Sequence, residues 1–415
     1  MMLQAPDAAE TGDRPMSADV RNDLDLFKIR TALIQAFLAE RNLDGVLLTR
    51  ADNFAMATGG RRNYIWTYAD AGANALFVHR DGRVFFVGDT IEKPRIMAEE
   101  LDGFGCGSVD YLWFESSPAE AVSKAFPGAV ASDDGSIGPN VHGDLAVLRA
   151  LLTPMELEKY RELGRRAAEA MTATLLDIRA GDRENDIAAR LVYEGQRREC
   201  QVPVALIAAD DRIRFRHPLP SQGSLLGRDT GVTRVQGYVM VVGCFLKEGL
   251  VVSLTRFKRV GKLPEGVADA YARICGVDAI AQEATRPGRT LGEVFDDLAA
   301  AYAQLGFAAN EWHNHHQGGT TGYAGRTCKG KPGESFPVLD TFWPERLRLL
   351  AGLDVPFGSA FAWNPSGGGA KSEDTFLLLP DGSKEIVSRT PALPTVNLEA
   401  VLRRPVDVVK SAMAE

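Results

Sequence analysis

The sequence predicts an α+β protein of two domains, and three patterns lead to this prediction. A helix and a hairpin pattern open the chain, a helix-start signal near Thr153 marks a boundary, and a helix-entry pattern occurs twice beyond it. With 415 residues, 45% of them apolar and 25% charged, the chain is long enough for two globular cores. We expect a smaller α/β domain first and a larger domain after it.

The first domain is expected over residues 23–150. Leu26, Leu33 and Phe37 recur at helical spacing, which predicts one apolar helix face. Two short apolar runs, Ala75–Val78 and Val84–Val87, flank Asp81–Gly82, and an Asp-Gly pair between such runs favours a tight hairpin turn.

The second domain is expected over residues 151–400, followed by a tail at 401–415. Thr153–Glu156 has the sequence of a capping box with proline at the first helical position, which predicts the start of a long helix. Gly181 and Gly288 each follow an amphipathic helix and precede apolar residues at the same offsets. This weak internal repeat indicates helix pairs related by pseudo-twofold symmetry around a shared sheet; the alternative is chance similarity of helix-entry signals.

Composition excludes several classes of partner. The formal net charge of −8 argues against a nucleic acid or an anionic membrane, because either needs a concentrated basic face. Residues 1–22 contain acidic residues and proline in place of a signal peptide, so we expect a disordered tail. The five cysteines form no CxxC pair, which favours a reducing cytoplasm.

Four segments hold most of the histidines, arginines and special glycines of the second domain. They are Arg214–Ser221, Val239–Gly261, Glu311–Arg326 and Ala362–Thr375. The order, the spacing and the residue types of these segments resemble those of the creatinase/aminopeptidase P superfamily, over about residues 26–379. The resemblance implies a pita-bread catalytic domain with pseudo-twofold αβ repeats. It also implies a homodimer in which the N-terminal domain of one copy closes the site of the other.

The departures from the superfamily pattern concern its metal ligands. Val242 and Ser253 stand where metallopeptidase members have two aspartates, and Asn364 stands in the place of a glutamate. Only His316 and Glu373 keep side chains of ligand type. Because two divalent cations require several anionic oxygen ligands, we expect no dinuclear centre and no metal or other cofactor.

His217 and Glu373 are the leading catalytic candidates. His217 occupies the place of the catalytic histidine of creatinase, the metal-free branch, and an imidazole can move a proton near neutral pH without a metal. The alternative is a loop histidine that caps backbone groups. Glu373 is expected to point into the site and to orient an imidazole or hold a cationic group; the alternative is a surface salt bridge to Lys371.

His316 is predicted to be a second proton donor. If its segment is an extended strand, His313 and His315 alternate away from it, so a zinc site on this cluster is disfavoured. Cys244, on the central strand, is interpreted as core filler more readily than as a nucleophile.

Arg326 is predicted to clamp a substrate carboxylate, because a guanidinium binds carboxylates in bidentate fashion. Thr255 matches a glutamate that binds guanidinium in creatinase, so a strongly cationic substrate is disfavoured. Further predicted substrate-binding residues are Ser253, Tyr323, Asn364 and, from the partner's N-terminal domain, Arg62. Arg61, Tyr64 and Trp66 are candidates beside Arg62, or they belong to a solvated loop.

These observations favour a metal-independent pita-bread enzyme that acts on a small, carboxylate-bearing C–N compound, most readily by hydrolysis. Three alternatives stay open. One is a metallohydrolase of the Xaa-Pro peptidase type that uses one metal. Another is a metal-free lyase, isomerase or cyclase of a biosynthetic pathway. The last is a pseudoenzyme whose pocket binds a ligand or peptide.

Overall fold

The computed structural model describes residues 2–4, 18–67, 69–221, 233–339 and 342–415. The chain forms two compact units. Unit 1 comprises Met1–Met155 and Thr341–Phe357, and unit 2 comprises Glu156–Asp340 and Gly358–Glu415. The chain first passes from unit 1 to unit 2 after Met155, close to the boundary expected at residue 150. Residues 341–357 were expected in the second domain but belong to unit 1.

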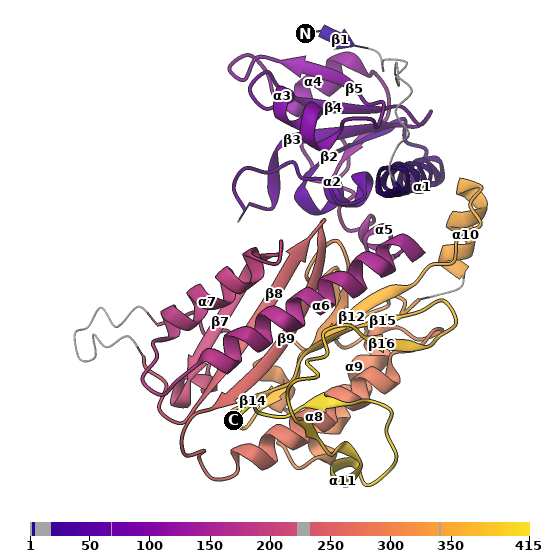
Figure 1. The fold of residues 1–415 in the computed structure, drawn as a ribbon. Helices are drawn as coiled ribbons and strands as arrows, with labels where there is room; N and C mark the ends of the chain where they lie inside the picture. The colour runs from indigo at the N-terminus through magenta and orange to yellow at the C-terminus, as the bar shows by residue number, and fades with distance from the viewer. Residues whose placement is uncertain (1, 5–17, 68, 222–232, 340–341) are drawn as a thin grey trace. The chain divides into compact units, whose positions relative to one another are not determined.

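Unit 1 is built on one mixed sheet (Figure 1). Its strands lie in the order β1-β5-β4-β3-β2-β6, with β2–β6 and β4–β5 parallel and the other neighbours antiparallel. They span β1 Met2–Gln4, β2 Gly45–Arg50, β3 Ala71–His79, β4 Val84–Asp89, β5 Gly107–Tyr111 and β6 Val130–Ser132. Strands β3 and β4 form the predicted hairpin, in which Val78 pairs with Val84.

The first helix of unit 1, α1, is the helix predicted from the sequence, and its residues Leu26, Leu33 and Phe37 are buried. The helices of unit 1 span α1 Ala18–Glu40, α2 Ala51–Thr58, α3 Lys93–Arg95, the π-helical turn η1 Ile96–Glu100, α4 Pro118–Ala125, α5 Ala146–Ala150 and α10 Phe342–Ala351. Within the segment expected to be a disordered tail, residues 2–4 form β1 and residues 18–22 begin α1. Residues 1 and 5–17 lie outside the described residues.

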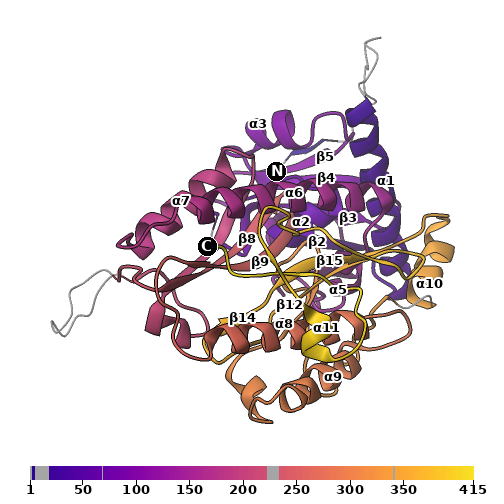
Figure 2. The ribbon, with the colours of Figure 1, turned by 60° about the horizontal axis from the view of Figure 1, so that its bottom comes forward.

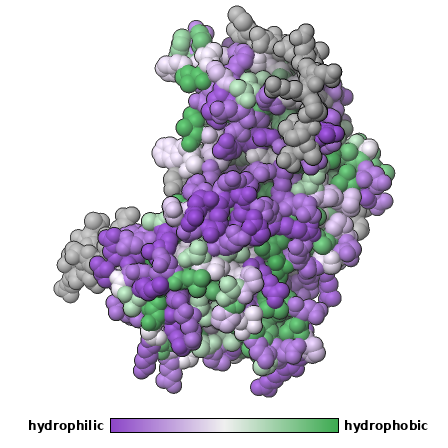
Figure 3. Space-filling view, viewed as in Figure 1, coloured by the Kyte–Doolittle hydropathy of each residue, from purple (hydrophilic) through white to green (hydrophobic). Residues whose placement is uncertain are grey.

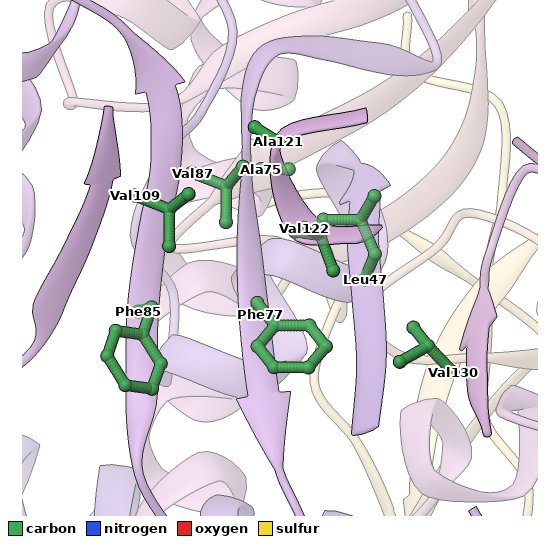
Figure 4. Packing of buried hydrophobic residues seen from close by; sticks show 9 residues of the cluster. All are labelled: Leu47, Ala75, Phe77, Phe85, Val87, Val109, Ala121, Val122 and Val130. Atoms are coloured by element: carbon green, nitrogen blue, oxygen red, sulfur yellow. The ribbon is translucent and has the colours of Figure 1, made fainter. Parts of the chain in front are cut away.

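An apolar cluster joins the sheet of unit 1 to α4 (Figure 4). Because side chains of a strand alternate between its two faces, residues two apart point to the same side. Phe85 and Val87 of β4 therefore share a face with Phe77 of β3, and Ala121 and Val122 of α4 cover it. This cluster contains none of the predicted site residues.

Unit 2 contains two larger antiparallel sheets. One has the order β7-β8-β9, and the other has the order β11-β10-β12-β15-β16. Their strands span β7 Gln201–Ala209, β8 Tyr238–Lys247, β9 Leu250–Arg259, β10 Gly318–Thr321, β11 Cys328–Lys329, β12 Ser359–Trp363, β15 Asp374–Leu378 and β16 Lys384–Ile386. Short pairs are formed by β13 Ser366–Gly367 with β14 Ala370–Lys371, and by β17 Thr395–Val396 with β18 Lys410–Ser411.

The helices of unit 2 follow the predicted repeat. They span α6 Pro154–Asp177, which begins at the unit boundary, α7 Glu184–Gln196, α8 Val267–Ala284, α9 Leu291–Gln304 and α11 Leu398–Leu402, with 3-10 turns η2 Asp210–Arg214 and η3 Glu311–Asn314. Gly181 and Gly288 adopt left-handed φ angles of 89° and 82°, and Thr290 and Glu293 form the capping box of α9. Helices α8 and α9 pack side by side (Figures 1 and 2).

Hydrophilic residues cover most of the face in Figure 3, and hydrophobic residues form small separate patches on it. Within the described part of the chain, no helix combines the length and the apolar character that a bilayer-spanning segment needs.

Candidate functional site

The two sheets of unit 2 meet between β9 and the start of β15. Thr255 and Glu373 form an isolated antiparallel bridge, in which the Thr255 amide donates to the Glu373 carbonyl at 3.1 Å. Two residues earlier on β9, the Ser253 amide donates to the Thr375 hydroxyl at 2.8 Å. The predicted residues Ser253, Thr255 and Glu373 are therefore brought together, although they come from distant parts of the sequence.

Glu373 is buried and contacts two cationic side chains. Its Oε1 lies 2.6 Å from the Arg326 guanidinium, and its Oε2 lies 3.7 Å from the Lys371 ammonium. The Thr255 hydroxyl donates to Oε2 at 2.8 Å. Burial alone would raise the pKa of Glu373, but Lys371 and Arg326 outweigh it and hold the pKa below its usual value. Glu373 is thus an ionised internal carboxylate, which differs from the surface salt bridge considered as the alternative.

The next residue, Asp374, points to the opposite side of β15 and joins a second buried ion network. Arg256 donates to its Oδ1 at 2.6 Å, and Lys410 donates to its Oδ2 at 2.9 Å. Lys410 also lies 2.6 Å from Asp278. Because Lys410 is only 1% exposed and comes from the segment expected as a tail, the C-terminal residues hold the strand that begins next to Glu373.

Three imidazoles form a cluster in the same unit. The Nε2 atoms of His217 and His315 are 3.1 Å apart, and the His315 and His316 rings stack with centroids 4.5 Å apart. The His217 ring stacks on His316 at 5.0 Å. The expectation that His315 points away from His316 is therefore wrong. His313 is exposed and does not belong to the cluster.

The local backbone explains why the rings converge. Residues Glu311–Asn314 form the 3-10 turn η3, so the stretch before His315 is not the extended strand that strict alternation assumes. After it, Gly318 and Gly319 have φ angles of 99° and 146°, and a Cβ on Gly318 would lie 2.2 Å from the Ala362 carbonyl oxygen. Regular alternation is thus interrupted on both sides of His315 and His316.

The loop that carries His217 is tied to the same segment. Arg216 donates to Glu311 at 2.5 Å and to the Ser366 hydroxyl at 3.2 Å. Glu311 belongs to η3 and Ser366 to β13, so the ion pair fixes the loop against the element that precedes His315. His217 itself stays exposed.

Burial and nearby cationic side chains lower the pKa of all three imidazoles. Burial, followed by Lys371, lowers the pKa of His217, and Glu373 opposes this effect. Burial and the charge of Arg326 lower the pKa of His316 to about 4. Burial and Lys371 also lower the pKa of His315, which is 7% exposed. All three rings are therefore neutral at neutral pH.

The other predicted substrate-binding residues do not lie together: Asn364 and Tyr323 belong to unit 2, and Arg62 belongs to unit 1. Asn364 is buried, its backbone N–H donates to the Gln317 backbone carbonyl at 3.0 Å, and its side-chain Oδ1 has no hydrogen-bond partner among the described residues. The buried Tyr323 hydroxyl donates to Glu156 at 2.5 Å, so it faces the long helix α6. Arg62 belongs to unit 1, where it pairs with Glu100 at 3.0 Å. Its contact with a partner's site stays a prediction.

Cys244 lies opposite Ser253 on the central strands, and the Ser253 hydroxyl donates to its sulfur at 3.1 Å. Burial raises the pKa of the Cys244 thiol, which keeps it protonated and supports its interpretation as a small filler. Val242 is buried between β7 and β9, where it pairs with Leu206 and Thr255.

Sequence reasoning misplaced two members of this site. Lys371 was considered only as the partner of a surface salt bridge, although it lies two residues before Glu373 and the alternation of a strand could have placed both on one face. His315 carried a signal in the His-x-His-His cluster, but the turn that aims it at His217 was not predicted.

A separate cavity of about 380 Å³ lies in unit 1. It is lined by Thr90, Asp110, Tyr111, Leu112, Glu115, Ser116, Ala121 and Lys124. None of the predicted site residues lines it, and the imidazole and carboxylate groups described above lie in the other unit.

No family model and no curated protein matches the sequence. Solved structures resemble the chain over most of its length. Dipeptidase PepE from Mycobacterium ulcerans is 17% identical, with 89% of this chain and 97% of that chain covered and a TM-score of 0.66. The prolidase from Pyrococcus horikoshii OT3 is 15% identical, with coverages of 88% and 98% and a TM-score of 0.63. The N-terminal domain of the FACT complex subunit SPT16 from Cicer arietinum (chickpea) is 9% identical, with coverages of 91% and 99% and a TM-score of 0.61.

These likenesses confirm the predicted fold. The chain has the pita-bread fold that it shares with these structures, preceded by a smaller N-terminal domain. At such low identity they establish the fold and not the reaction.

Proposed function

We propose that this pita-bread chain is a metal-independent enzyme that performs acid–base chemistry on a small, carboxylate-bearing C–N compound, with hydrolysis as the reaction. One observation carries the proposal. The exposed imidazole of His217 lies 3.1 Å from the buried imidazole of His315. The charges of Lys371, Lys329 and Arg326 act on His217, and the Glu373 carboxylate opposes them.

His217 has the position of a proton-transfer group. It is open to solvent, so a substrate can reach it, and its neutral ring offers a lone pair that can accept a proton. The buried His315 ring can hold the orientation of His217 through the contact between the two Nε2 atoms, in which one ring donates and the other accepts. His316 stacks on both rings, but its lowered pKa keeps it neutral, which argues against its predicted role as a second proton donor.

The charges beside His217 favour an anionic substrate. Lys371, Lys329 and Arg326 all lower the pKa of His217, whereas Glu373 is the carboxylate that opposes them. The excess of positive charge attracts a carboxylate and repels a guanidinium. One Arg326 nitrogen is already bound to Glu373, so we expect Arg326 to act on a substrate first through its charge.

Metal independence is supported by the residues at the other ligand positions. Val242 and Ser253 are buried and uncharged, and Asn364 offers a neutral amide. Glu373, the remaining carboxylate, is already engaged by Arg326 and Lys371. Such a donor set lacks the anionic oxygens that two hard cations need.

A second candidate is a peptidase of the Xaa-Pro type. The observation in its favour is that the solved structures similar to this chain include a dipeptidase and prolidases. A metal-dependent activity on Xaa-Pro dipeptides would distinguish it from the first candidate.

The test compares His217→Ala with His313→Ala, an exposed neighbouring histidine outside the cluster. Chelator-treated protein is incubated with carboxylate-bearing amides, amidines and Xaa-Pro dipeptides, and products are followed by mass spectrometry. We expect turnover by wild type and His313→Ala, and a loss of roughly a hundredfold or more in His217→Ala. Stability should change by less than about 0.5 kcal/mol in either variant, because both residues are exposed. Full turnover by His217→Ala would remove this residue from the mechanism.

A further inference from the structure

The three imidazoles also have the arrangement of a ligand set for one metal ion. One ring nitrogen from each of His217, His315 and His316 lies within 4.8 Å of the others, and the closest described pair is 3.1 Å apart. Bonds of about 2.0–2.1 Å place two nitrogen ligands of a tetrahedral ion roughly 3.3 Å apart. One pair therefore already has about the required separation, and the exposed His217 leaves the ion open to solvent on that side.

We propose that His217, His315 and His316 bind a single divalent ion such as Zn²⁺ or Co²⁺. This site is different from the dinuclear carboxylate centre of the superfamily, because two of its three ligands come from outside that pattern. Imidazole nitrogen suits zinc, cobalt, nickel and copper, whereas magnesium, calcium and manganese prefer oxygen. Three protein ligands leave a fourth position open to water or an anion.

Unsatisfied ring nitrogens support the assignment. The Nδ1 atoms of His315 and His316 are buried and have no hydrogen-bond partner among the described residues, and His315 is 7% exposed. Buried polar atoms in proteins are nearly always satisfied, so these unpartnered nitrogens are unusual. An ion held by the Nε2 atoms of His217 and His315 cannot also bind the Nδ1 atom of His315, because one imidazole offers a single nitrogen to one ion. The Nδ1 atom of His316, which has no hydrogen-bond partner among the described residues, can serve as the third ligand atom.

The surrounding charge sets the affinity. Arg216, Arg326, Lys329 and Lys371 act on these imidazoles, and Glu373 compensates only part of their charge. A divalent cation is therefore bound against electrostatic repulsion. We expect micromolar rather than nanomolar affinity, and an anion such as chloride, hydroxide or a substrate carboxylate as the fourth ligand.

Metal binding has a consequence for the reaction proposed above. A ring nitrogen bonded to a metal cannot accept a proton. Because the ion and the transferred proton need the same lone pair of His217, the bound ion should inhibit the enzyme. This consequence rests on the proposed function, whereas the binding itself does not.

The binding test uses full-length protein freed of metal by EDTA and dialysis. Titration with CoCl₂ should produce the visible absorption of four-coordinate cobalt with one equivalent, and ZnCl₂ should displace it. Calorimetry with ZnCl₂ should give the same stoichiometry for wild type and for the control His313→Ala. His217→Ala and His315→Ala should each weaken binding by at least about tenfold. His217 is exposed, so its variant should fold even if the buried His315 position does not tolerate alanine.

The outcomes separate the two proposals. Equal affinity in wild type and His217→Ala, or no binding above a surface level, overturns the tri-histidine site. Zinc that binds with one equivalent but leaves turnover unchanged supports the site and contradicts the role of His217 as the proton acceptor.

Discussion

Replacing Glu373 with Gln removes the one negative charge that contacts both Arg326 and Lys371. Glu373 is 2% exposed, and the side chains of Arg326 and Lys371 are 15% and 4% exposed, so the two cations would stay buried without their partner. Removing one partner of a buried ion pair costs about 3–5 kcal/mol. Because Arg326 keeps some access to water, we take the lower end, about 3 kcal/mol.

Scanning calorimetry measures this effect. At about 2–4 °C for each kcal/mol, the melting temperature of unit 2 should fall by roughly 6–12 °C. The two units can melt separately, so each transition is followed by itself. The matched control is Glu385→Gln, which breaks a surface pair of 2.9 Å with Arg161 and should cost no more than about 1 kcal/mol.

A double variant tests the cause. Glu373→Gln combined with Lys371→Met removes the carboxylate and the more deeply buried cation together, so part of the lost stability should return. Millimolar acetate should also stabilise the single variant more than wild type, because the anion can take the vacated place between the cations. A single variant no less stable than Glu385→Gln would refute the view that Glu373 neutralises these cations.

Three further predictions follow from the same features. We expect a twofold homodimer in which each N-terminal domain covers the site of the other copy; a mass of one chain by light scattering at micromolar concentration would contradict it. Purified protein should contain well under one equivalent of zinc, manganese, iron or cobalt by elemental analysis, and its turnover should survive EDTA. Activity that is lost with EDTA and restored by metal would instead favour the peptidase. Lys410→Met should lower the melting temperature of unit 2, because it leaves Asp278 and Asp374 buried with less compensation, and an unchanged melting temperature would argue against the C-terminal clamp.

Local signals made much of the fold predictable. The capping box at Thr290 and the hairpin turn at Asp81–Gly82 depend on residues a few positions apart, and both are present in the structure. The repeat of Gly181 and Gly288 also depends on local backbone demands, since both adopt left-handed conformations that glycine tolerates. Resemblance in four short segments then implied the pita-bread fold, although the single shared sheet expected from the repeat is divided into a three-stranded and a five-stranded sheet.

The site was predicted less completely, because its contacts are long-range. Whether Lys371 and Glu373 face a surface or an interior depends on the docking of β15 against β9 through Thr255, which no local pattern encodes. The direction of His315 depends on the turn before it and on Gly318 after it. Strict alternation failed at that place because the backbone there is not a regular strand.

The substitutions at the ligand positions and the cations around Glu373 are two parts of one charge balance. In a dinuclear centre, metal cations neutralise several carboxylates. Here Val242 and Ser253 contribute no charge, and Arg326 and Lys371 already exceed the single charge of Glu373 by one. A hard cation added next to Glu373 would increase this excess. An anionic substrate would cancel it, so this charge balance supports the proposed carboxylate-bearing substrate and argues against a dinuclear metal centre.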